Sequence, residues 1–189
     1  MKSLDDRLDI ILGKITSDDF LRGKSVAGEI PFWIFDYLPE HEEKVRAHIP
    51  FLLEQAPKRR RGLKVAHVNL LALVRDILSS RNLLDKAHAM YRAKGSDAVL
   101  RAMKAPLDAE AVAKALWSRL DPQAEVVLIS GVGSAYPLVR THNLLNNLHP
   151  LSGSTPLLFF YPGRYDGQSL SLFGDLHDNP YYRAFRIDE

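Results

Sequence analysis

Four short apolar runs, separated by long amphipathic stretches, constrain the fold more than any other feature of the chain. The runs cover residues 30–35, 63–68, 126–130 and 156–161. Each is too short for a helix, whereas the stretches between them carry apolar residues at helical spacing. Strands that alternate with helices form a mainly parallel sheet, because parallel neighbours need crossover connections that cover the faces of the sheet. The sequence therefore predicts a three-layer α/β fold.

The expected sheet has four to five strands with helices on both faces. The candidate for a fifth strand is the segment 182–187. From about residue 71 to residue 120 the chain shows only helical patterns, which predicts a helical insertion between the second and third strands. No polar linker divides the chain, so residues 1–189 are expected to form a single domain.

Local signals mark several helix ends. Ser3 and Asp6 form a capping-box-like pair, and Asn69 and Asp108 are well placed to cap the helices that follow them. Pro50 lies inside a helical pattern, where it lacks an N–H group and crowds the preceding turn. We therefore expect a kink or a restart of that helix at Pro50.

Composition excludes several classes of protein. The 189 residues include 25 Lys and Arg against 23 Asp and Glu, a net charge of +2, so no global field draws the whole chain to nucleic acid or membrane. The absence of cysteine excludes disulfides and thiolate metal sites and fits a cytoplasmic protein. The apolar runs fall far short of the roughly 20 residues that span a bilayer. The seven histidines suggest no metal site, so no metal or cofactor is expected.

The loops after the predicted strands carry the candidate functional residues. In parallel sheets such groups gather at the carboxyl ends of the strands, which meet at one edge. The candidates are Asp36 and Tyr37 after the first strand, Asn69 after the second, Gly131 to Ser134 after the third, and Tyr161 to Arg164 after the fourth. We expect them to share one surface.

The turn from Gly131 to Ser134 joins the third strand to a helix. Gly131 and Gly133 permit a tight turn, and the N-terminus of the helix could attract an anion. However, no Lys follows as in a phosphate-binding loop, and Tyr136 stands where a dinucleotide fingerprint has its third glycine. The pattern favours a plain turn capped by Ser134, with a nucleotide or phosphate site as the alternative.

The segment after the fourth strand combines turn residues with aromatic residues. Arg164 lies between Tyr161 and Tyr165, and its guanidinium could present a fork of donors to a phosphate or a carboxylate. Alternatively, Arg164 pairs with Asp166 or stacks on Tyr165 to hold the loop. Both interpretations stay open.

A basic run is the candidate for contact with nucleic acid. It consists of Lys58, Arg59, Arg60, Arg61 and Lys64. Such a run could bind phosphates without reading bases; a solvated loop is the alternative. Because it leads into the second strand, it should lie at the opposite sheet edge from Gly131 and Arg164. We find no set of nucleophile, base and oxyanion donor, so no catalytic residues are expected.

Two segments of the chain are distinctive: Glu29 to Tyr37, and the tract from Gly131 through Leu144–Leu148 to Leu170. They resemble the BrxB family of bacterial BREX phage-defence systems. The resemblance implies a cytoplasmic protein that acts in phage exclusion beside a DNA methyltransferase, a large ATPase and the alkaline-phosphatase-like protein PglZ. It brings no established catalytic residues. We therefore expect a non-enzymatic assembly subunit that associates with a PglZ-like protein and other BREX proteins, with anion binding at Gly131–Ser134 or weak DNA contact at Lys58–Lys64 as alternatives.

Overall fold

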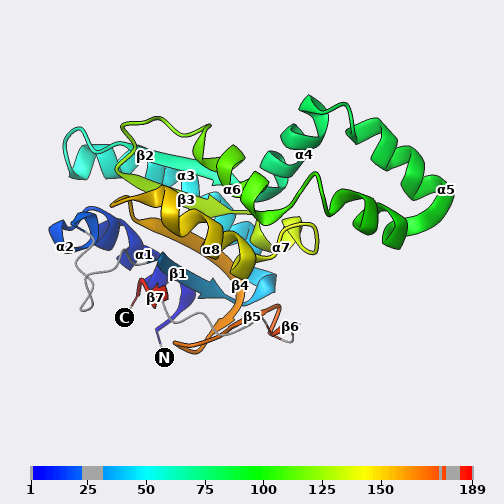
Figure 1. Ribbon diagram of the computed structural model, residues 1–189. Coiled ribbons are helices and arrows are strands. Elements are labelled where there is room, and N and C mark those ends of the chain that lie inside the picture. The colour runs from blue at the N-terminus through cyan, green and yellow to red at the C-terminus, as the bar shows by residue number, and fades with distance from the viewer. Residues whose placement is uncertain (1, 23–31, 175, 178–183, 189) are drawn as a thin grey trace.

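Five parallel strands form the centre of the computed structural model, which describes residues 2–22, 32–174, 176–177 and 184–188. In spatial order they are β2 (Val65–Asn69), β3 (Val126–Ser130), β4 (Leu157–Tyr165), β1 (Phe32–Tyr37) and β7 (Ala184–Arg186) (Figure 1). Every neighbouring pair among them is parallel. The predicted mainly parallel sheet is confirmed. Residues 30, 31, 182 and 183 of the predicted strands lie outside the described part.

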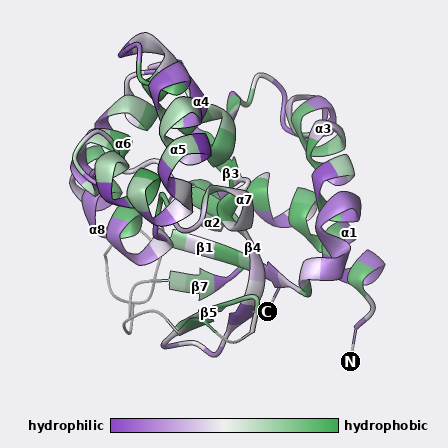
Figure 2. Cartoon of the chain, turned by 90° about the vertical axis from the view of Figure 1, so that its right-hand side faces the viewer, coloured by the Kyte–Doolittle hydropathy of each residue, from purple (hydrophilic) through white to green (hydrophobic). Residues whose placement is uncertain are grey.

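Helices cover both faces of this sheet, as expected. One face packs against α1 (Leu4–Ile15), α2 (Asp18–Leu21) and α3 (Glu42–Arg59). The other packs against α4 (Leu70–Ser80), α6 (Ala109–Trp117), α7 (Val132–Ala135) and α8 (Thr141–Ser152). Figure 2 shows α1 and α3 on one side of the sheet and α4, α6 and α8 on the other. The predicted helical insertion between β2 and β3 is confirmed: it contains α4, α5 (Leu84–Met103) and α6.

The two faces of the sheet form two apolar cores. Phe159 of β4 belongs to the core under α4, α6 and α8, whereas Phe160 belongs to the core under α1 and α3. All five residues of β3 are buried. Strands buried on both faces appear as continuous apolar runs without alternation, which is why the sequence revealed them.

The fourth strand continues beyond its predicted end at Tyr161. Its last residues, Gly163 to Tyr165, leave the parallel sheet and pair antiparallel with β5 (Leu170–Leu172). A further short strand, β6 (Leu176–His177), pairs with β5. The sequence did not predict β5 or β6, because strands of three and two residues carry too little pattern.

Most of the predicted helix ends are confirmed. Ser3 and Asp6 form a full capping box, while Asn69 and Asp108 accept hydrogen bonds from the N–H groups of Ala72 and Ala111. Ser134 does not cap a helix, because the left-handed Gly131 takes the N-cap position of α7.

Helix α3 does not restart at Pro50 but runs unbroken from Glu42 to Arg59. Pro50 is exposed. The carbonyl oxygen that its ring leaves without a helical partner therefore faces water, which can supply a hydrogen bond.

Gly163→Ala is predicted to destabilise the protein by about 1–3 kcal/mol, the range for overpacking. A Cβ at Gly163 would overlap the carbonyl oxygen of Ser171 and lie 2.9 Å from a ring carbon of Tyr161. Urea unfolding measures the loss. The matched control is Gly13→Ala in α1, where the nearest atom lies 3.9 Å away, and a gain of about 0.4–1 kcal/mol is expected. Equal stability of Gly163→Ala and the wild type would contradict the tight β4–β5 contact.

Candidate functional site at the carboxyl edge of the sheet

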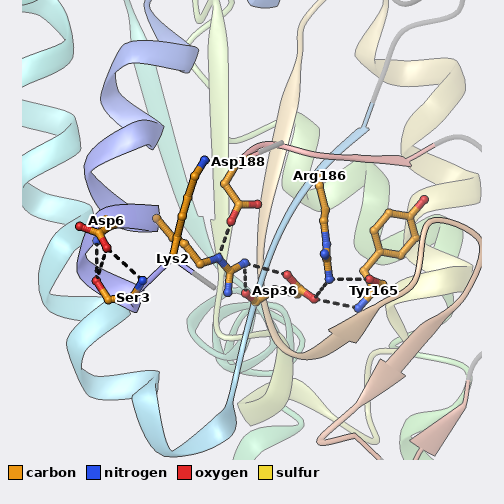
Figure 3. Close-up of polar contacts among 8 residues, drawn as sticks. Lys2, Ser3, Asp6, Asp36, Tyr165, Arg186 and Asp188 are labelled. Carbon is orange, nitrogen blue, oxygen red and sulfur yellow. Dashed lines mark hydrogen bonds and ion pairs between the residues drawn. The ribbon is translucent and has the colours of Figure 1, made fainter.

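One buried carboxylate organises the carboxyl edge of the sheet. Asp36, near the end of β1, is 5% exposed. Its Oδ1 accepts a hydrogen bond from Nη2 of Arg7 at 2.9 Å. Its Oδ2 accepts from Nη2 of Arg186 at 2.7 Å and from the N–H of Tyr165 at 3.0 Å (Figure 3). Asp36 thus ties α1, β7 and the end of β4 to β1.

The partners of Asp36 are themselves held in place. Arg7 also donates to the carbonyl oxygen of Asp36 at 2.7 Å and pairs through Nε with Asp188. Arg186 donates to the carbonyl oxygen of Tyr165 at 2.7 Å. The hydroxyl of Tyr165 donates to the carbonyl oxygen of Ala184 at 2.6 Å. Two guanidinium groups therefore balance two carboxylates. We call Arg7, Asp36, Arg186 and Asp188 the ion-pair cluster.

An open pocket of about 1140 Å³ lies beside the ion-pair cluster. The loop after β1 lines it together with the β4–β5 turn and β7. Leu38 and Phe185 in its lining are 43% and 40% exposed. The guanidinium of Arg164 in the same lining is exposed and makes no hydrogen bond or ion pair to any residue that the structure describes. The pocket therefore combines apolar surface with an unneutralised cation.

Asp166 stabilises its own turn. Its carboxylate accepts hydrogen bonds from the N–H groups of Gln168 and Ser169 at 2.8 and 2.6 Å, and from the hydroxyl of Ser169 at 2.7 Å. These bonds favour the charged form and lower the pKa of Asp166 to about 2. Within the described chain no ion pair joins Asp166 to Arg164.

The tyrosines near the pocket are buried. Tyr161 and Tyr165 are 0% and 2% exposed, and Tyr37 is 3% exposed. The hydroxyl of Tyr37 donates to Glu42 at 2.6 Å, and burial together with this carboxylate raises the pKa of Tyr37. Among the residues predicted at the ends of β1 and β4, Arg164 and Asp166 are exposed.

The remaining predicted residues lie along the same edge at β2 and β3, where Asn69 pairs with Ser130 in register. The hydroxyl oxygen of Ser130 lies 2.8 Å from Nε2 of His67 and accepts from the amide of Asn69 at 3.3 Å. Burial lowers the pKa of His67, which favours its neutral form. Ser130 is only 4% exposed, so these bonds join the two strands instead of presenting a nucleophile.

Both glycines of the turn after β3 face side chains of the protein itself. Gly131 has φ 71°, and a Cβ there would lie 2.8 Å from the amide of Asn69. A Cβ at Gly133 would lie 2.8 Å from the ring of Phe173 and 2.9 Å from that of Pro162. Ser134 is the third residue of the short helix α7. The close approach of these neighbours gives each glycine a packing role.

The structure thus brings the predicted residues to one edge, where they form two groups. Sequence reasoning missed Arg7, Arg186 and Asp188. One signal was available, since Arg7 is a cation within the apolar helical stripe of Leu4, Leu8 and Ile11. In the structure its guanidinium lies 4.9 Å from the ring centre of Phe35, and the side chain is partly buried.

The basic run lies at the amino edge of the sheet, opposite Arg164, as expected. Lys58 pairs with Glu54 at 2.6 Å, and Arg60 pairs with Asp18 at 2.6 Å. Lys64 lies 3.7 Å from Asp121. Arg59 and Arg61 are exposed and have no ion pair to a described residue. Acidic neighbours therefore neutralise three of the five cations.

The described residues contain neither a candidate metal site nor a helix that could cross a membrane. Within 2–22, 32–174, 176–177 and 184–188, no three His, Asp or Glu residues are grouped so that they could hold a metal ion. No helix in these ranges has both the length and the apolar character needed to cross a membrane.

Asp36→Asn is predicted to lower the free energy of unfolding by about 2–3 kcal/mol. It leaves two guanidinium groups without their shared countercharge, and removing one partner of a buried pair costs several kcal/mol. The expected loss is smaller than for a fully buried pair because the Arg186 side chain is 34% exposed, so water partly screens its charge. Urea unfolding measures the change.

The matched control is Glu110→Gln, which breaks a fully exposed pair with Lys114 and should lower the free energy of unfolding far less than Asp36→Asn does. Equal losses of unfolding free energy in the two variants would show that the ion-pair cluster stabilises the fold no more than a surface pair does.

Comparisons with known proteins agree with this picture. A profile of the family described as "BREX protein BrxB" matches residues 66–187. The chain is 38% identical to a BREX protein BrxB from Bacillus cereus (strain H3081.97), over 99% of the chain and 98% of that protein. It is 36% identical to one from Escherichia coli O9:H4 (strain HS), over 97% of the chain and 91% of that protein. No solved structure matches significantly. The expected resemblance is confirmed, and the chain belongs to the BrxB family.

Proposed function

We propose that this BrxB-family chain is a cytoplasmic, non-enzymatic assembly subunit of a BREX phage-defence system, which docks a partner protein at the carboxyl-edge pocket. The observation that carries the proposal is Arg164. It is an exposed cation in the pocket lining, without a countercharge among the described residues. Family membership supports the BREX setting.

The chemistry of the pocket indicates what the partner presents. A guanidinium binds a carboxylate through two parallel hydrogen bonds, and arginine is frequent at binding hot spots. Leu38 and Phe185 add exposed apolar surface in the same lining. Such a surface suits a partner segment with an acidic side chain beside an apolar one. A PglZ-like protein is the partner that the family resemblance favours.

The polar groups of the pocket support a binding role over a catalytic one. Asp36 and Asp188 each lie in ion pairs, and Asp166 binds its own turn. The hydroxyl of Tyr37 donates to Glu42. Acid–base catalysis needs a group that can take up and release a proton beside the substrate, whereas these groups are engaged in holding the fold.

Arg164→Glu is predicted to weaken co-purification of a PglZ-like partner and to reduce phage exclusion. We expect affinity to fall about thirtyfold, because a hot-spot side chain contributes about 2 kcal/mol. The measurement is quantitative pull-down from cells that express both proteins, together with phage plating. Melting temperature checks that the variant stays folded.

The matched control is Arg119→Glu, which makes the same charge change at an exposed arginine just after α6, whose guanidinium donates to the carbonyl oxygen of Ala115. This control variant should co-purify with the PglZ-like partner and exclude phage as the wild type does. A PglZ-like partner retained equally by the two variants would contradict docking at the pocket.

A further inference from the structure

Helix α5 forms an arm that projects from the body of the protein, away from the sheet (Figure 1). The chain turns at Gly95, which has φ 76° and ψ −178° inside this helix and divides it into two segments. Its buried residues are Ala87 and Met103, towards its two ends. Between residues 88 and 97 every side chain except the half-buried Met90 is exposed. We call residues 81–104 the arm.

The arm is strongly basic along its length. It carries six cations, at Arg81, Lys86, Arg92, Lys94, Arg101 and Lys104, against two carboxylates, at Asp85 and Asp97. Its formal charge is therefore +4, and since the whole chain carries +2, the rest carries −2. Positive charge is therefore concentrated in the arm, although the net charge of the whole chain is small.

Among the described residues, the cations of the arm form no ion pairs. Arg81 donates to the backbone carbonyl of Pro106. The other five cations of the arm are exposed and have no ion pair to any described residue. The basic run at 58–64 differs, because three of its cations are in ion pairs. The arm therefore presents the larger unneutralised charge.

The composition of the arm favours a nucleic acid over a protein as its partner. A protein interface needs an apolar core, and Tyr91 is the one large apolar side chain of the arm that is strongly exposed, at 61%. Lys and Arg side chains alone suffice to bind phosphates, since the released counterions drive the association.

The shape of the arm favours duplex DNA. An α-helix with its side chains is about 10–12 Å wide, which fits the major groove of B-DNA, about 12 Å wide. The major groove of duplex RNA is deep and narrow. We propose that the arm binds the phosphate backbone of duplex DNA, with residues 84–94 of α5 in the major groove. This surface is distinct from the pocket and from the run at 58–64.

The test compares two triple variants that remove the same charge. K86Q/R92Q/K94Q changes exposed residues of the arm, and K58Q/R59Q/R61Q changes the basic run. Fluorescence anisotropy with a short labelled DNA duplex measures the binding of the full chain from about 50 to 200 mM salt. The arm variant should bind at least about tenfold more weakly, and its slope of log K against log salt should fall by about 0.9 for each lost phosphate contact. The run variant should keep the wild-type slope.

Three results would overturn the proposal: no salt-dependent binding of the wild type, equal losses in the two variants, or preference for duplex RNA or for polyglutamate over DNA. Circular dichroism checks that the arm stays helical. Lys94→Glu, at an exposed position beside the turn, gives a second readout that does not depend on helix packing. It should weaken DNA binding in the same direction, and unchanged binding would count against the arm.

Discussion

The buried carboxylate of Asp36 is the interaction on which the carboxyl edge depends. Its three side-chain and backbone donors come from residues 7, 165 and 186, so a single side chain joins both ends of the chain to the middle of the sheet. A buried charge is stable only while its partners stay in place. The ion-pair cluster therefore fixes part of the pocket lining. Its charged groups already form ion pairs with one another.

The sheet and several helix ends could be predicted because their signals are local. All five residues of β3 are buried, and the first four are apolar, as is typical of a strand covered on both faces. Capping by Ser3, Asn69 and Asp108 involves residues three positions apart. Helix α3 does not restart at Pro50, and the sequence alone did not reveal that Pro50 lies on the exposed side of this helix.

The site could be predicted only in part. The sequence predicted that Asp36 and Arg164 lie on one edge of the sheet, because the carboxyl ends of parallel strands lie side by side. It missed Arg7 and Arg186, which lie 29 and 150 positions from Asp36. No periodic pattern encodes an ion pair over such a separation. Tyr161 was expected on the surface shared with Arg164, but its ring and that of Tyr165 are buried, because both residues belong to the extended β4 and pack into the core.

Net charge proved a poor guide to what the chain can bind. Near neutrality excludes a global field, yet at physiological salt charges are screened beyond about 8 Å. The first segment of α5, residues 84–94, is roughly 16 Å long at 1.5 Å per residue, so cations near its tip are screened from the acidic body. The pocket presents Arg164 as an exposed cation beside apolar side chains, whereas the arm presents five exposed cations without ion pairs to described residues. The two surfaces therefore differ in local charge density, although both belong to one nearly neutral chain.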